Sequence, residues 1–142
     1  MLIAKNRFYA KIFSEMFKLR KIKKKYLAIL NGKIKKNKGE LHTKDELNGK
    51  KIISKLNFEV ISKRNNFSYL EIDLITGRKH QIRKQFFDIG HPVVGDTKFG
   101  DKKNKNPLCL LSHEIEFEYN NKIKKYKATI PEHFKTCLEK FF

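Results

Sequence analysis

The sequence predicts an α+β domain built on a mixed, mainly antiparallel sheet with flanking helices. Residues 52–62 and 67–75 alternate apolar and polar side chains as half-buried strands do, and an Arg-Asn-Asn turn joins them. A second hairpin follows near the end of the chain, where residues 114–119 and 122–130 flank an Asn-Asn turn. No repeat or long linker divides the 142 residues, so we expect a single domain.

The composition favours a globular protein with a polyanionic partner. Lys and Arg number 33 against 15 Asp and Glu, a net charge of +18, and neutralised phosphates release counterions that favour binding. Most of the cations are lysines, which an AT-rich coding sequence also produces. Cys109 and Cys137 form no disulfide framework, and the chain shows no signal core or membrane-length apolar run. These features indicate the reducing cytoplasm and no membrane.

The N-terminal segment is predicted to be a strand end followed by an amphipathic helix. Leu2-Ile3-Ala4 is short and apolar, as the end of a strand is, and Asn6 is expected to cap a helix over residues 7–18. An apolar stripe at helical spacing is expected to lie in the core. It comprises Phe8, Ile12, Phe13, Met16, Phe17 and Leu19.

The cationic residues 20–25 have two interpretations, a solvated turn or a contact with RNA phosphates. Residues 26–30 then form a strand candidate, which the Asn31-Gly32 turn ends. Residues 33–51 are polar and Lys-rich. We expect them to form an elaborated loop, mobile or facing RNA, with at most one short strand near residues 40–42.

The last third of the chain is predicted to contain a charged hairpin and a docking helix. Residues 96–106 read as a polar loop, and residues 108–111 as a short buried run. Glutamates of the first hairpin strand are expected to pair with lysines of the second. Pro131 suits the first position of a last helix. The residues of that helix expected to dock on the sheet are Phe134, Leu138 and Phe141.

The most polar bend of the chain joins a strand to a helix. Thr76-Gly77-Arg78-Lys79-His80-Gln81-Ile82-Arg83 leads into a helix over residues 81–89, which Gly90 ends and Pro92 follows. Cations are unfavourable at a helix N-terminus. The two arginines therefore indicate a partner charge, either a carboxylate of the protein or a phosphate of a ligand. The alternative is a basic helix start on a basic protein.

Three stretches match one family signature in order and spacing. They are Lys25-Tyr26-Leu27-Ala28, ending near Gly32; the bend from Thr76 to Arg83; and Ile89-Gly90-His91-Pro92-Val93-Val94-Gly95-Asp96 with Phe99-Gly100. In these stretches the chain resembles the RluA-type RNA pseudouridine synthases, from its first residues to about Pro131. The resemblance implies part of the pseudouridine synthase catalytic fold.

The resemblance also implies an isomerase that needs no cofactor. Such enzymes break the N–C glycosidic bond of a uridine, rotate the base and rejoin it through C5. By motif, Arg83 would pair with the catalytic aspartate, and Tyr26 would lie against the flipped base. A buried carboxylate needs a bidentate partner to remain ionised, and a flipped base needs a flat aromatic surface. Both residue types therefore suit this chemistry.

The other motif residues are assigned to RNA contact or to the backbone. Around the bend, contact with the RNA backbone and bracing of the loop remain open alternatives. Including the cationic run, the residues assigned to RNA are Arg78, Lys79, His80, Gln81, Lys24 and Lys25. A structural role is expected for Thr76, Gly77, Gly90, His91, Pro92, Gly95 and Asp96. No metal site is expected, because the histidines lack ligand spacing.

One family motif has no match in the chain. The family's catalytic aspartate lies in a His-Arg-Leu-Asp motif shortly before the segment matched by residues 2–6. We therefore expect residues 1–142 to form a single partial catalytic domain, from a truncated or split gene or a start assigned at an internal methionine. Arg83 is expected to lack its carboxylate, at a cost of about 3–5 kcal/mol for a buried pair. An unpaired sheet edge is expected to lower stability or favour aggregation.

The sequence leaves three functions open. The first is an RNA pseudouridine synthase acting on uridine in structured rRNA or tRNA, active only when the missing N-terminal fragment is supplied as a partner. The second is a non-catalytic basic module that binds RNA or the ribosome. The third is a decayed gene product without a stable function. The coding sequence upstream would separate them, because a His-Arg-Leu-Asp segment there supports the first or the third, and its complete absence supports the second.

Overall fold

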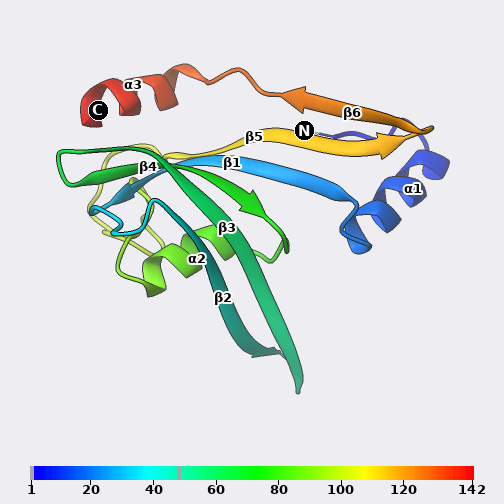
Figure 1. The fold of residues 1–142 in the computed structure, drawn as a ribbon, viewed down its shortest axis with the longest axis horizontal. Helices are drawn as coiled ribbons and strands as arrows, with labels where there is room; N and C mark the ends of the chain where they lie inside the picture. Colours follow the sequence, from blue (N-terminus) through cyan, green and yellow to red (C-terminus); the bar gives the residue numbers. More distant parts are fainter. Residues whose placement is uncertain (1, 48) are drawn as a thin grey trace.

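The protein forms an antiparallel sheet of six strands with three helices in its computed structural model (Figure 1), which describes residues 2–47 and 49–142. The strand order is β2-β3-β4-β1-β5-β6, and every pairing between neighbours is antiparallel among these residues. The predicted α+β class is confirmed. The elements are α1 (Arg7–Lys18), β1 (Ile22–Asn31), β2 (Lys38–Leu47), β3 (Lys50–Arg64), β4 (Phe67–Leu74), α2 (Gln81–Asp88), β5 (Leu110–Tyr119), β6 (Lys122–Lys127) and α3 (Glu132–Phe141).

The two faces of the sheet carry separate apolar clusters. On one face, Leu30 and Ile72 pack with Phe86 of helix α2. On the other face, Leu27 packs with Phe134 of helix α3. Figure 1 shows the two helices on opposite sides of the sheet, so we name these sides the α2 face and the α3 face. Phe86 and Phe134 are fully buried, which anchors each helix on its face.

Both predicted hairpin turns are present. Asn65 and Asn66 join β3 to β4, and Asn120 and Asn121 join β5 to β6, with φ values between 48° and 64°. Asparagine tolerates this left-handed region, and two such residues give the turn that matches the twist of antiparallel strands. Strand β6 ends at Lys127, three residues before the predicted end.

The prediction of a loop over residues 33–51 is wrong for most of these residues, because they form strand β2, which pairs with β3. The register places Lys38 opposite Glu59. The Glu40 carboxylate lies 2.5 Å from the Lys55 ammonium on the neighbouring strand. An edge strand of this kind is stabilised by backbone pairing and cross-strand charges, so its sequence carries little apolar alternation.

Helix α1 has the predicted bounds and cap but not the predicted burial. The Asn6 side chain accepts a hydrogen bond of 3.0 Å from the Tyr9 N–H. No residue of α1 is buried; Phe13 contacts Phe117 of β5 edge to face, and Phe8 is 68% exposed. The stripe was expected in the core, and this expectation is wrong because α1 packs on the β5–β6 end of the sheet (Figure 1).

Two further N-terminal expectations are corrected. Residues 2–4 form no strand. Only the start of the cationic run, at Arg20, is a turn, since Lys23, Lys24 and Lys25 belong to strand β1. Alternate side chains of a strand point to opposite faces, so the lysines of this run are distributed over both faces of the sheet. Lys24 shares the α2 face with Tyr26, and Lys25 lies on the α3 face.

The predicted pairing across the last hairpin is confirmed on the α3 face. The Glu114 carboxylate lies 2.9 Å from the Lys125 ammonium and 3.5 Å from that of Lys127. Lys25 and Glu71, 2.5 Å apart, extend the ion pairs to the centre of the sheet. Carboxylates therefore offset much of the lysine charge on this face.

Helix α3 docks much as predicted. Pro131 stands at the N-cap position, just before the first helical residue, Glu132. Phe134 and Phe141 are buried as expected, and Cys137 lies buried with them. No helix in the described part of the chain is long and apolar enough to cross a membrane.

Candidate active site

Hydrogen bonds from two buried side chains hold the bend between β4 and α2. The Thr76 hydroxyl donates to Gln81 Oε1 and accepts from the Lys55 N–H, each at 2.8 Å. Gln81 Oε1 also accepts from the Arg78 N–H, while Gln81 Nε2 donates to the Lys55 carbonyl and to Gln85. The sequence assigned Gln81 to RNA, but these bonds use its amide inside the protein. Gln81 and Thr76 brace the bend.

Helix α2 begins at a strained residue without a side-chain cap. His80 occupies the N-cap position with φ 57° and ψ 21°, a left-handed conformation that few residues other than glycine adopt, although histidine adopts it more often than most. Its Nδ1 lies 3.3 Å from Arg83 Nη1. A guanidinium only donates, so this nitrogen carries no proton. Partial burial, followed by the nearby cations Lys98, Arg83 and Lys79, lowers the pKa of His80, which favours the neutral ring.

Arg83 is not left without a carboxylate, contrary to the expectation from the sequence. Its Nε donates to Asp96 Oδ2 at 2.7 Å and its Nη2 to Asp96 Oδ1 at 2.6 Å. This is the bidentate geometry in which a guanidinium and a carboxylate bind most specifically. The hydrogen bonding of Arg83 to the Asp96 carboxylate, which accepts from it, raises the pKa of Arg83 further. The partner charge indicated by the basic helix start is thus a carboxylate of the protein itself.

Asp96 is held ionised although it is 1% exposed. Burial by itself would raise the pKa of Asp96, but hydrogen bonds from Arg83 and from the N–H groups of Phe99 and Lys98 outweigh it and lower that pKa. The two backbone N–H groups reach Asp96 Oδ1 at 3.0 and 2.9 Å. Both carboxylate oxygens are therefore engaged.

The loop after α2 aims Asp96 at Arg83 through close backbone contacts. Gly95 has φ 76°, and a Cβ at this position would lie 2.0 Å from the Pro107 carbonyl oxygen. A Cβ on Gly100 would lie 2.7 Å from the Asp96 carbonyl oxygen. His91 Nδ1 binds the Asn31 carbonyl at 3.0 Å and so ties the loop to β1. Only glycine fits at the two crowded positions.

A cavity of about 280 Å³ brings Tyr26 and Arg83 to one place on the α2 face. Tyr26 comes from β1, whereas Arg78, His80, Gln81 and Arg83 come from the bend and α2. Apolar side chains form the rest of the cavity lining. They are Leu74, Ile82, Leu108 and Leu110.

The remaining residues assigned to RNA lie at different distances from this cavity. Lys24 reaches the bend, since a Cβ on Gly77 would lie 3.4 Å from its Nζ. Lys79 is exposed to solvent. Lys25 is not brought to the cavity, because it pairs with Glu71 on the opposite face.

Gly77 does not need a left-handed φ, in contrast to Gly90, whose φ is 79°.

Sequence reasoning missed the part of the site formed by Phe99. Its ring centroid lies 5.4 Å from the Arg83 guanidinium carbon, within cation–π range, and 5.9 Å from the His80 ring. Leu108 and Leu110 as cavity walls were also missed. The sequence contains the Phe99-Gly100 motif, but Phe99 lies far from Arg83 along the chain, so the sequence did not predict their contact.

The chain belongs to the RNA pseudouridylate synthase family, whose family model matches residues 1–87. Ribosomal large subunit pseudouridine synthase C of Buchnera aphidicola subsp. Baizongia pistaciae is 30% identical over 164 residues, which cover 98% of this chain and 51% of the relative. The protein of the same name from Haemophilus influenzae is 28% identical and covers 99% of this chain and 50% of its own. The chain thus spans about half the length of these relatives.

Solved structures show the same fold. Human RNA pseudouridylate synthase domain containing 1 superposes with a TM-score of 0.78 at 22% identity, covering 90% of this chain and 62% of the human one. Human RNA pseudouridylate synthase domain containing 4 gives the same TM-score at 20% identity.

Proposed function

We propose that this chain carries the base-binding part of an RNA pseudouridine synthase active site, which isomerises uridine in structured rRNA or tRNA in the cytoplasm. The cavity shared by Tyr26 and Arg83 is the observation on which the proposal rests. Relatives named for ribosomal RNA and for tRNA, the latter from Haemophilus ducreyi, support both RNA classes as substrates.

The two residues have tasks that suit their surroundings. Tyr26 presents a half-buried ring at the cavity wall, on which a flipped uracil can stack. Asp96 occupies the Nε and Nη2 edge of Arg83, and its Nη1 faces His80. That second edge is the one left to bind the catalytic carboxylate.

We propose that the aspartate that starts the reaction comes from polypeptide outside these 142 residues. Within the described part of the chain, no carboxylate lines the cavity. Asp96 is buried and uses both oxygens, so it cannot approach a base. Asp96 therefore holds Arg83 in place, and an N-terminal fragment with the His-Arg-Leu-Asp motif is the proposed partner.

The distribution of charge favours RNA on the α2 face. Around the cavity, Arg78, Lys79 and Lys24 have no carboxylate in an ion pair among the described residues. On the α3 face, Lys25 is neutralised by Glu71. Unpaired cations release counterions when they meet phosphates, so we exclude Lys25 from the proposed RNA contacts.

The test compares this chain with the same chain fused behind an N-terminal segment of a family member that is chosen because it contains the His-Arg-Leu-Asp motif. Pseudouridine formed in rRNA and tRNA transcripts is measured for both. We expect activity only in the fusion, with loss in Arg83→Ala and Tyr26→Ala, while the control Lys25→Ala retains it. Activity of the unfused chain would overturn the assignment of the nucleophile, and full activity of either site variant would overturn the site.

A non-catalytic RNA-binding module is the second candidate. The absence of a carboxylate from the described cavity wall favours it. A fusion that binds the transcripts but forms no pseudouridine would support this candidate over the first.

A further inference from the structure

The Arg83 guanidinium is held along one edge by Asp96 and at its third nitrogen by His80. Its Nε and Nη2 donate to the Asp96 carboxylate at 2.7 and 2.6 Å. Two bonds along one edge still allow the guanidinium to swing about that edge. Nη1 lies off this edge, and among the described residues it has one hydrogen bond, to His80 Nδ1 at 3.3 Å. The bond to His80 therefore limits the motion that Asp96 leaves.

An unusual backbone conformation places His80 for this bond. It precedes α2 with φ 57° and ψ 21°, and its side chain makes no capping hydrogen bond, although side chains at this position commonly accept from the first turn. Its carbonyl still accepts from the Lys84 N–H at 2.9 Å, so the helix begins with its usual backbone bond. A left-handed residue other than glycine at the wall of a cavity indicates a constraint on its side chain. The contact with Arg83, three residues further along the helix, supplies that constraint.

The ring of Phe99 packs against both partners of this bond. Its centroid lies 5.9 Å from that of the His80 ring, at an interplanar angle of 62°, and 5.4 Å from the Arg83 guanidinium carbon. The edge contact with the imidazole and the cation–π contact with the guanidinium restrict both groups. His80 also lines the cavity of about 280 Å³ that contains Tyr26 and Arg83. The imidazole is thus part of the wall of the proposed active site.

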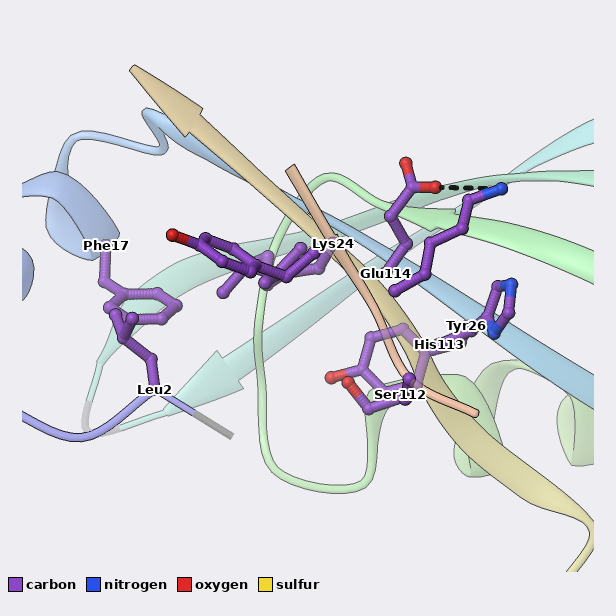
Figure 2. A pocket seen from close by; sticks show the side chains of 11 residues that line it. Leu2, Phe17, Lys24, Tyr26, Ser112, His113 and Glu114 are labelled. Carbon is purple, nitrogen blue, oxygen red and sulfur yellow. Dashed lines mark ion pairs between the residues drawn. The ribbon is translucent and has the colours of Figure 1, made fainter. Parts of the chain in front are cut away.

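The cleft beside Tyr26 is where the proposed upstream segment joins the chain. Leu2 and Tyr26 line one cavity of about 440 Å³, and Figure 2 shows Leu2 across this cavity from Tyr26. Tyr26 also lines the smaller cavity together with Arg83. A carboxylate carried by the segment that precedes Leu2 therefore meets the guanidinium on the side that Asp96 does not occupy.

We propose that His80 is a positioning residue, which holds Nη1 of Arg83 at the angle needed to bind the catalytic aspartate. The inference rests on the proposed function, because it takes Arg83 as the partner of that aspartate. Nη1 carries two N–H groups, so His80 accepts one and the other remains for the carboxylate. Of the alternatives for the bend, this assigns His80 to the protein and not to the RNA backbone. A small error in the orientation of a catalytic group lowers the rate strongly.

The test removes the imidazole without straining the backbone, in the fused chain that supplies the His-Arg-Leu-Asp motif. His80→Gly keeps the left-handed conformation without steric cost. His80→Asn also adopts it and offers an amide oxygen in place of Nδ1. We expect kcat for pseudouridine formation to fall at least about tenfold in His80→Gly, with KM changed less than about twofold. His80→Asn should recover most of the rate.

Asn121→Gly is the matched control for the change to glycine. Asn121 is an exposed turn residue, and its φ of 56° is close to that of His80. The substitution should leave kcat and KM unchanged, and equal melting temperatures should show that all three variants fold.

A second measurement uses the unfused chain and does not depend on catalysis. NMR follows the exchange of the Arg83 Nη1 protons with water, and Arg83 is one of only five arginines in the chain. We expect His80→Gly to accelerate this exchange at least about fivefold, because one hydrogen bond is lost. His80→Asn should accelerate it less.

Unchanged kcat or unchanged exchange in His80→Gly would overturn the inference. So would a kcat of His80→Asn as low as that of His80→Gly, because the acceptor would then have no role. Weaker binding of labelled RNA by His80→Gly at an unchanged kcat would assign His80 to RNA contact instead. Absence of pseudouridine from the unsubstituted fused chain would overturn the proposed function, while the exchange measurement would still show whether His80 holds Arg83.

Discussion

Helices α2 and α1 lie on the same face of the sheet, yet the chain anchors them by different means. Helix α2 buries Gln81, Ile82, Gln85 and Phe86, whereas α1 buries no residue. Polar bonds add to the packing of α2, because Gln85 Nε2 donates to the Ser54 carbonyl at 3.2 Å. At the other end of the sheet, Tyr9 and Phe13 of α1 contact the rings of Phe117 and Tyr119 on β5.

The same face of the sheet therefore has one end where side chains are held rigidly and one end where they remain exposed. At the α2 end, buried packing and a bidentate ion pair fix the guanidinium of Arg83 in one orientation, as the proposed active site requires. At the α1 end, Phe17 remains exposed beside a cavity.

The largest expected effect comes from the loop that supports the α2 end. Gly95→Ala would place a Cβ 2.0 Å from the Pro107 carbonyl oxygen at a φ of 76°, so we expect a loss above about 4 kcal/mol. Gly49→Ala is the control, because its φ is 71° but no atom lies within 4 Å of its Cβ. That change should cost only about 1–2 kcal/mol. Urea unfolding measures both, and similar losses would contradict the role of crowding at Gly95.

A pair of phenylalanines compares the two helices directly. Phe86→Ala empties a fully buried position under α2, and we expect a loss of about 3–5 kcal/mol. Phe13→Ala removes a half-buried ring from α1 and should cost about 1 kcal/mol. Equal losses in chemical denaturation would show that α1 is as firmly anchored as α2.

The ion pair at the α2 end should make stability depend on acid pH. The folded-state pKa of Asp96 lies below its unfolded value, so its contribution is complete above about pH 4 and disappears as the pH falls through the lower folded pKa. Asp96→Asn should cost about 2–4 kcal/mol at pH 7 and flatten this part of the pH profile. Glu71→Gln, which breaks a partly exposed pair, should cost less than about 1 kcal/mol. An unchanged profile in Asp96→Asn would contradict the assignment.

The smallest expected effect concerns RNA binding by the lysines on the two faces of β1. Lys24→Ala should reduce the salt dependence of RNA binding by about one phosphate contact, because Lys24 lies on the α2 face and its ammonium lies near Gly77 of the bend. Lys25→Ala should leave the slope unchanged, since Lys25 is paired with Glu71. Titrations of labelled RNA at several salt concentrations measure the slopes. A larger change for Lys25 would place RNA on the α3 face.

Local patterns predicted the elements that depend on near neighbours. Asn6 capped α1, the Asn-Asn pairs formed turns, and the stop at Gly90 ended α2 as expected. Strand β2 escaped prediction, because its stability comes from pairing with β3 and not from its own apolar pattern. The exposure of α1 was also not predicted. An apolar stripe shows which side of a helix faces the protein, but not how completely its partner surface buries that side.

Short-range spacing in the sequence by itself determined the α+β class, and the resemblance of its motifs to the family marked Tyr26 and Arg83 as the residues to examine. The tertiary structure alone decided that Arg83 binds Asp96, that Lys25 faces away from the cavity and that Tyr26 lines two cavities. These facts depend on which strands become neighbours and which face each residue takes. Such long-range contacts are set by the packing of the whole sheet.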